Sequence, residues 1–185
     1  MVSHTVPSKR GCVTATTTQF RGIGGCRGNV GEPAVALFSS TFVNKVDRKG
    51  RVSVPASFRA ELASQVVAGV VAFRSVKYPA LDASGYDRLE DITQRLDELP
   101  EFSDERDALA SVLADAQQMT FDSEGRITLP QALAEHAGIT ENVAFVGVGR
   151  TFQLWEPQRY QTHRDEMREM ARLRNLTLPP RGNSK

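Results

Sequence analysis

Apolar and polar residues follow one plan in two stretches of the chain: a strand, a polar turn, a short strand and a helix. In the first stretch Val52 and Val54 fall on one face of an alternating segment. Pro55 ends that segment and suits the first turn of a helix with Phe58 and Leu62 on one side. This stretch predicts strands over residues 40–46, 51–54 and 66–76 and a helix over 56–64.

The plan restarts after a middle section of two helices, the second of which has Ser103 as its expected N-cap. In the second stretch Ile127 and Leu129 alternate toward the inside, Pro130 opens a helix, and Gly138 closes it. The other elements expected here are helices over residues 86–99 and 104–116 and strands over 118–121, 126–129, 142–148 and 151–155.

The two ends of the chain differ in their patterning. Residues 1–36 are rich in Gly, Thr, Ser and Arg and lack apolar periodicity, which predicts disorder. A last helix over residues 157–173 carries apolar residues at helical spacing, so this face is expected to pack on the core. Its members are Tyr160, Met167, Met170 and Leu173.

A short cassette, Asp-x-x-Gly-Arg-x-x-x-Pro, occurs twice, at Asp47–Pro55 and at Asp122–Pro130, with an offset of 75 residues. The likeness continues, because Val71-Ala72-Phe73 matches Val143-Ala144-Phe145 at an offset of 72. Such a repeat indicates a duplicated unit. One unit of roughly 45 residues is too small to bury a core alone. The two units are therefore expected to interlock into one pseudo-symmetric β-barrel of an α+β protein.

Each cassette begins with a predicted turn. Asp47 and Asp122 are expected to tie these turns by accepting backbone hydrogen bonds. Gly50 and Gly125 supply the backbone freedom that such turns require. These four residues are the ones we expect to shape the loops.

The net charge of +1 hides an uneven distribution. Residues 1–34 hold four cations and one anion, and residues 168–185 hold five cations and one anion. The section between them, residues 35–167, holds 14 cations and 20 anions. Such an acidic section cannot attract a polyanion through its average field, so nucleic-acid binding would require a local basic patch.

The first turn region supplies such a patch. Residues 45–51 hold four cations and one anion, whereas the second turn, residues 122–126, sums to −1. An arginine fork matches the O6 and N7 acceptors of guanine, and lysine suits phosphate. Our hypothesis is that Arg51 or Arg48 reads guanine while Lys45 and Lys49 hold the DNA backbone. Arg126 either contacts DNA or pairs with a carboxylate of its own turn.

The middle helices carry many acidic residues, which indicate a solvated face that DNA would not approach. They are Asp87, Glu90, Asp91, Asp97, Glu98, Glu101, Asp104, Glu105 and Asp107.

Little in the sequence favours an enzyme. Its histidines, His4, His136 and His163, belong to no HExxH pattern, and neither a phosphate loop nor a Gly-x-Ser-x-Gly elbow occurs. Cys12 and Cys26 are expected to be free thiols, because a structural zinc site needs four close ligands. We expect no catalytic residue, metal or cofactor.

No stretch of the sequence is long and apolar enough to cross a bilayer. The N-terminus lacks the apolar segment of a secretory signal. These two observations predict a cytoplasmic protein.

The runs at 42–55 and 121–130 and the ending Phe152-Gln153-Leu154-Trp155 resemble the MraZ family. The resemblance covers about residues 37–175 and implies two SpoVT/AbrB-like domains with swapped hairpins that assemble into a closed ring. It implies a nucleoid-associated bacterial repressor that binds G-rich direct repeats in double-stranded DNA. The target would be the division and cell-wall gene cluster, including the repressor's own operon, without a cofactor, a small-molecule substrate or a membrane partner. In the family this loop faces DNA, which singles out Arg48, Lys49, Arg51 and Arg126.

The resemblance divides the chain into six segments. They are an extension at 1–36, SpoVT/AbrB-like domains at 37–83 and 118–158, a helical linker at 84–117, a C-terminal helix at 159–175 and a flexible tail at 176–185. The extension is either the product of a misplaced start codon or a basic arm that adds non-specific DNA affinity. The alternative function is an AbrB-like antitoxin or protein-binding module, although such antitoxins usually have one unit and a disordered tail.

Overall fold

The computed structural model describes residues 37–63, 65 and 67–177, and the predictions for 1–36 and 178–185, including Cys12, Cys26 and His4, lie outside this range. The described chain is a mixed α+β fold, as the pattern predicted. Its elements are β1 (Thr41–Lys45), β2 (Arg51–Ser53), α1 (Ala56–Ala63), β3 (Gly69–Arg74), β4 (Leu81–Ser84), α2 (Tyr86–Asp97), α3 (Asp104–Ala114), β5 (Gln117–Thr120), β6 (Arg126–Thr128), α4 (Gln131–Ala137), β7 (Asn142–Gly147), β8 (Phe152–Trp155) and α5 (Pro157–Leu173).

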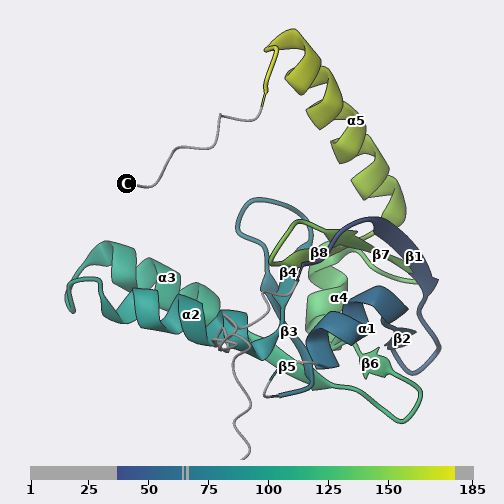
Figure 1. Ribbon diagram of the computed structural model, residues 1–185, viewed down its shortest axis with the longest axis horizontal. Helices are drawn as coiled ribbons and strands as arrows, with labels where there is room; N and C mark the ends of the chain where they lie inside the picture. Colours follow the sequence, from purple (N-terminus) through teal and green to yellow (C-terminus); the bar gives the residue numbers. More distant parts are fainter. Residues whose placement is uncertain (1–36, 64, 66, 178–185) are drawn as a thin grey trace, which may run out of the picture. The chain divides into compact units, whose positions relative to one another are not determined.

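The duplication governs the strand order. β1, β2, β3 and β4 of the first copy correspond to β5, β6, β7 and β8 of the second, and α1 corresponds to α4. Six strands form an antiparallel sheet in the order β1-β7-β8-β4-β3-β5, and β2 pairs with β6 (Figure 1). Exchanging each strand for its counterpart reproduces this order in reverse. The copies are thus interlocked around a pseudo-two-fold axis that passes between β4 and β8.

The strands were expected to form a closed barrel, but the hydrogen bonds of the described strands do not close one. The large sheet ends at β1 and β5, and one isolated bridge, Val46 with Val52, links β1 to β2. β2 and β6 stop after three residues, just before Val54-Pro55 and Leu129-Pro130. Proline lacks the N–H that a ladder needs, so the β2–β6 ribbon cannot lengthen and close the sheet.

One hydrophobic core joins the two copies. The inward residues predicted in each cassette, Val52 and Val54 with Ile127 and Leu129, are all buried in it. Phe58 of α1 lies at its centre, with ring-centroid distances of 5.1 Å to both Phe38 and Phe152. Since a core of this kind draws on both copies, neither copy can be removed without exposing the other.

The prediction for α5 is wrong for most of the helix. Its N-terminal part does pack, because Tyr160 and His163 lie against Trp155, with ring centroids 5.9 and 5.0 Å away. Beyond this contact Met167 is 37% and Met170 38% exposed, and Leu173 is 75% exposed. The apolar patch beneath α5 consists of Trp155 and a few small residues, so it covers only the first turns of the helix. Helical spacing shows that a helix has an apolar face but not what covers it.

The element bounds differ from prediction in a few places. The sequence analysis expected no strand at the position of β4. A strand was predicted at its counterpart β8, so alignment of the two copies would have predicted β4 as well. α2 ends at Asp97 rather than 99, and α3 ends at Ala114 rather than 116. Ser103 caps α3 as expected, since its Oγ accepts a hydrogen bond from the Arg106 N–H at 3.2 Å.

Candidate nucleic-acid interface

The first turn, Asp47–Arg51, is built around one carboxylate. Asp47 Oδ1 accepts hydrogen bonds from the backbone N–H of Lys49 at 2.8 Å and of Arg51 at 2.9 Å. Asp47 Oδ2 accepts from Arg51 Nε at 2.8 Å and pairs with its Nη2 at 2.7 Å. Gly50 has a φ of +74°, a conformation that costs an L-residue strain. The motif needs aspartate, glycine and arginine because each makes a different part of this geometry.

The second turn, Asp122–Arg126, repeats the same hydrogen bonds. Asp122 Oδ1 accepts from the backbone N–H of Glu124 and of Arg126, both at 2.9 Å. Arg126 Nε donates to Asp122 Oδ2 at 2.8 Å, and Gly125 has a φ of +71°. The two turns therefore have the same backbone conformation. Any difference in what they bind comes from the side chains that point outward.

Each turn also forms a backbone hydrogen bond with the residue that follows the short strand of the other copy. The Leu129 N–H donates to the Gly50 carbonyl at 2.8 Å, and the Val54 N–H donates to the Gly125 carbonyl at 3.2 Å. β2 and β6 pair antiparallel, with Arg51 opposite Thr128 and Ser53 opposite Arg126. The turns consequently lie at opposite ends of the ribbon, and each depends on both copies for its shape.

The hydrogen bonds within the turns stabilise charged carboxylates. The Arg51 backbone N–H, and next the Arg51 guanidinium, lower the pKa of Asp47 from 3.8 to about 2. The corresponding groups of Arg126 lower the pKa of Asp122 below its ordinary 3.8. The side-chain hydrogen bond to Asp122 raises the pKa of Arg126 in return. Both aspartates are therefore ionised at neutral pH, and each holds its own arginine.

The outward side chains distinguish the turns. In the first turn region Lys45, Arg48 and Lys49 are exposed, and none forms an ion pair with any residue of the described ranges. In the second turn Ser123 and Glu124 replace the two cations, and Glu124 Oε2 pairs with Arg126 Nη1 at 2.7 Å. The structure thus places Arg48 and Lys49 on the first turn, with Lys45 at the end of β1 and Arg51 at the start of β2. It places Arg126 between two carboxylates.

A groove of about 620 Å³ lies beside the first turn and faces α4. Its lining includes Arg48 and Lys49 of the first turn, Gln131 and Ala134 of α4, and the apolar Ile139. An exposed cationic rim over an open groove suits a nucleic-acid backbone, which needs both access and positive charge.

The corresponding space at the second turn is occupied by Arg59 of α1. Its guanidinium lies directly over Gly125, and Arg59 Nη1 donates to the Glu124 carbonyl at 3.4 Å. At the offset of the repeat, the counterpart of Arg59 is Ala134, which is too short to cover Gly50. The sequence analysis did not single out either residue, although alignment of the two helices after the cassettes would have shown the difference.

Two other kinds of site find no support in the described residues. No group of three or more His, Cys, Asp or Glu side chains there is placed to hold a metal ion. None of the helices in the described ranges combines the length and apolar character that a membrane span requires.

The fold and the turns together define a duplicated α+β protein with two Asp-x-x-Gly-Arg turns, of which the first carries exposed cations. Residues 112–176 match the family model described as "MraZ protein, putative antitoxin-like". The chain is 41% identical over 143 residues to a transcriptional regulator MraZ of Rickettsia canadensis (strain McKiel), covering 77% of this chain and 96% of the relative. The identity to the MraZ of Rickettsia felis (strain ATCC VR-1525 / URRWXCal2) is 40% over the same shares of both chains. The chain belongs to the MraZ family of transcriptional regulators, which are not enzymes.

Proposed function

We propose that this regulator is a repressor that binds G-rich direct repeats upstream of the division and cell-wall gene cluster, including its own operon. The observation that carries the proposal is the first turn region, where three exposed cations have no ion pair in the described residues and two of them, Arg48 and Lys49, border an open groove. Cations that no carboxylate neutralises are available to phosphate. On this proposal the protein works in the cytoplasm, on the nucleoid.

The hydrogen bonds of the first turn suggest how its cations divide the work. Arg51 gives Nε and Nη2 to Asp47, which leaves the end-on pair of N–H groups on Nη1 and Nη2 for guanine. Arg48 keeps its whole guanidinium available, and we propose that Arg48 and Arg51 together read guanine. Lys45 and Lys49 would contact phosphates on either side, and Arg51 would also hold the turn in shape.

The same reasoning gives Arg126 an architectural role. Its guanidinium donates to Asp122 and pairs with Glu124, so two acidic side chains already share its charge. DNA phosphate would have to displace one of them while repelling both. We therefore propose that the first turn contacts DNA and that the second completes the fold.

Assembly into a closed ring would compensate for the small contact that a single turn can make. Several first turns on one rim could bind successive repeats at once, and linked binding events strengthen one another without new contacts. The interlocked pairing of β1 with β7 and of β3 with β5 is consistent with two SpoVT/AbrB-like domains of the swapped-hairpin type.

Selection of bound fragments from genomic DNA tests the proposal. The wild-type protein should enrich spaced G-rich repeats, whereas Arg48→Ala/Lys49→Ala should enrich nothing. Arg150→Ala is the matched control, because Arg150 is an exposed arginine in another tight turn, between β7 and β8. Equal enrichment by the double variant would refute the assignment of the first turn. No enrichment by the wild type would refute the repressor function itself.

A second candidate, an antitoxin that masks a protein partner, is supported by the words "antitoxin-like" in the description of the family model. It predicts a stoichiometric partner that copurifies with the protein. The selection experiment separates the two functions, because an antitoxin without DNA sites would enrich no repeats.

A further inference from the structure

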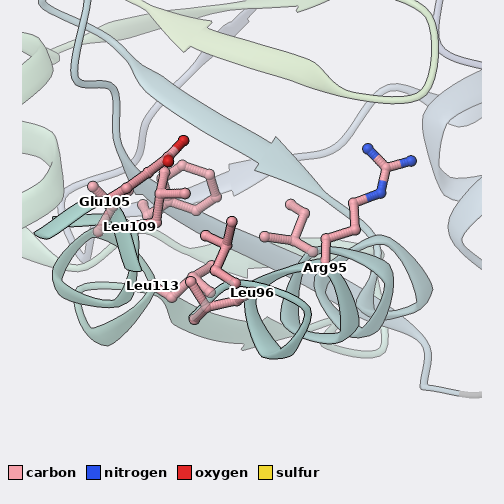
Figure 2. A pocket seen from close by; sticks show the side chains of 9 residues that line it. Arg95, Leu96, Glu105, Leu109 and Leu113 are labelled. Atoms are coloured by element: carbon pink, nitrogen blue, oxygen red, sulfur yellow. The ribbon is translucent and has the colours of Figure 1, made fainter. Parts of the chain in front are cut away.

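Two hollows in the described part of the chain differ in the side chains that line them. One, of about 390 Å³, lies between α2 and α3, where Leu96, Leu109 and Leu113 face it and Arg95 and Glu105 lie at its two ends (Figure 2). Its lining is apolar and its two charges are opposite in sign. The other is the groove of about 620 Å³ beside the first turn, which has two exposed cations and several polar side chains. Of these two, only the groove offers both positive charge and hydrogen-bonding groups to a nucleic acid.

Both copies of the repeat contribute to this groove. Arg48 and Lys49 come from the first turn, whereas Gln131 comes from α4 of the second copy. The Leu129 N–H donates to the Gly50 carbonyl at 2.8 Å, and Gln131 follows Leu129 after a single proline. A backbone hydrogen bond therefore holds the start of α4 beside the first turn, and the groove is a composite of the two copies.

Two positions distinguish α4 from its counterpart α1. At the offset of the repeat, Ala134 corresponds to Arg59 and Gln131 corresponds to Ala56. The Arg59 side chain covers the second turn, whereas the short Ala134 leaves the groove open. Gln131 places an amide beside the first turn, where Ala56 offers the second turn only a methyl group. Both differences make the first turn the better place to recognise a base.

Gln131 is presented on a rigid support. The buried side chains of Leu133 and Ala137 anchor α4 in the core, and Gln131 itself is exposed. Its Nε2 donates to Glu135 Oε1 at 2.7 Å, which holds the side chain on the helix surface. An amide nitrogen carries two hydrogens, so one N–H and the Oε1 acceptor of Gln131 stay available. Such a pair matches the N7 acceptor and the N6 amino group of adenine in the major groove.

We infer that Gln131 reads an adenine at a fixed distance from the guanine that is read by the first turn. This inference rests on the proposed function and adds a base-reading residue from the second copy. DNA lies across the groove, with phosphates at the cations of the first turn and a base edge at Gln131. The Glu135 carboxylate, which would repel phosphate, is not part of the groove lining. Because the Gln131 amide is uncharged, it contributes to the choice of sequence and not to the salt dependence of binding.

Selection of bound fragments from random double-stranded DNA tests this assignment with the full-length chain. The wild type should recover guanines with an adenine at a fixed distance from them. Gln131→Ala should recover the same guanines and lose the adenine. Gln131→Glu should replace the adenine by cytosine, because a carboxylate accepts from cytosine N4 and cannot donate to adenine N7. Ala56→Gln is the matched control, because it places the same side chain at the counterpart position of α1, and it should recover the wild-type sequence. A change of selected base cannot result from partial unfolding, which would weaken binding to every sequence alike.

Fluorescence anisotropy with the selected repeat measures the size of the effect. Replacing the adenine of the repeat should weaken binding of the wild type on the order of 10-fold and leave binding of Gln131→Ala unchanged. The salt slopes of the two proteins should agree, because no phosphate contact is lost. An adenine that Gln131→Ala still selects, or a wild-type repeat without an adenine preference, would overturn the inference alone, since the recovered guanines would still support the proposed repressor. Recovery of no repeats by the wild type would overturn both.

Discussion

The first and second turns have the same backbone conformation, but they differ in the charge of their outward side chains and in whether another side chain covers them. Aspartate, glycine and arginine make matching hydrogen bonds in both, within about 0.1 Å for each pair of equivalents. The outward residues are Arg48 and Lys49 in one turn and Ser123 and Glu124 in the other. One turn borders an open groove, and the other is covered by Arg59. A duplicated motif can therefore keep its architecture in both copies while only one copy presents exposed cations beside a groove.

Exchange of the outward residues gives the largest expected effect. Arg48→Ser/Lys49→Glu gives the first turn the side chains of the second and should lower DNA affinity on the order of 100-fold. The salt dependence, plotted as log affinity against log salt, should lose a slope of about 0.9 for each phosphate contact removed. Fluorescence anisotropy with a labelled repeat at several salt concentrations measures both quantities.

The matched exchange in the second turn is Ser123→Arg/Glu124→Lys, which restores the cations but leaves Arg59 in place. It should change affinity far less than the first exchange. If the two exchanges produced changes of similar size, the turns would contribute equally, and the proposed division of roles would be wrong.

Strain at the turn glycines comes next in size. Alanine at Gly50 would hold φ near +74° and place its Cβ 3.2 Å from the Leu129 carbonyl oxygen, so unfolding free energy should fall by about 1–2 kcal/mol. Gly125→Ala should cost a similar amount, because φ is +71° there and the Arg59 side chain must also move. Urea denaturation measures both.

Gly149→Ala separates strain from function. Gly149 has a φ of +85°, and a Cβ there would have nothing within 4 Å. The variant should lose comparable stability and keep its DNA affinity, whereas Gly50→Ala should lose both. Unchanged DNA binding by Gly50→Ala would show that the shape of the first turn does not matter for recognition.

These differences also show what the sequence could and could not reveal. The backbone hydrogen bonds that Asp47 accepts were predicted, because a turn is made by residues close together in the chain, whereas the ion pair of Asp47 with Arg51 was not. The covering of Gly125 by Arg59 was not, because Arg59 reaches this turn from another copy, and its hydrogen bond to the Glu124 carbonyl spans 65 positions. For the same reason Met167 and Met170 could be placed on one face of a helix but not assigned a partner. Local spacing specifies an element and its apolar side, whereas the neighbour of that side depends on the whole fold.

The pH dependence of stability gives a smaller effect that should be common to both turns. Asp47 has a pKa of about 2 in the folded protein and an ordinary value of 3.8 when unfolded. A lowered folded pKa means that the stabilisation is complete above about pH 4 and is lost as the pH falls toward 2. Asp47→Asn should be less stable than the wild type at pH 6, and the difference should shrink as the pH falls to 2. Urea midpoints at a series of pH values measure this, and a difference that stayed constant would contradict the role of the carboxylate charge.

Removal of the Arg59 side chain should have the smallest effect on DNA affinity. It tests whether the two turns differ in DNA binding because of their charge or because Arg59 blocks access to the second one. Arg59→Ala should uncover Gly125 and leave the second turn as open as the first, since Ala134 stands at the corresponding place beside Gly50. The opened turn still sums to −1, so DNA affinity and salt slope should remain within about twofold of the wild type, because no phosphate contact is gained. Combining Arg59→Ala with Ser123→Arg/Glu124→Lys should then raise affinity above either change alone, because charge and access would be present together. If Arg59→Ala alone strengthened DNA binding, access rather than charge would be what separates the two turns.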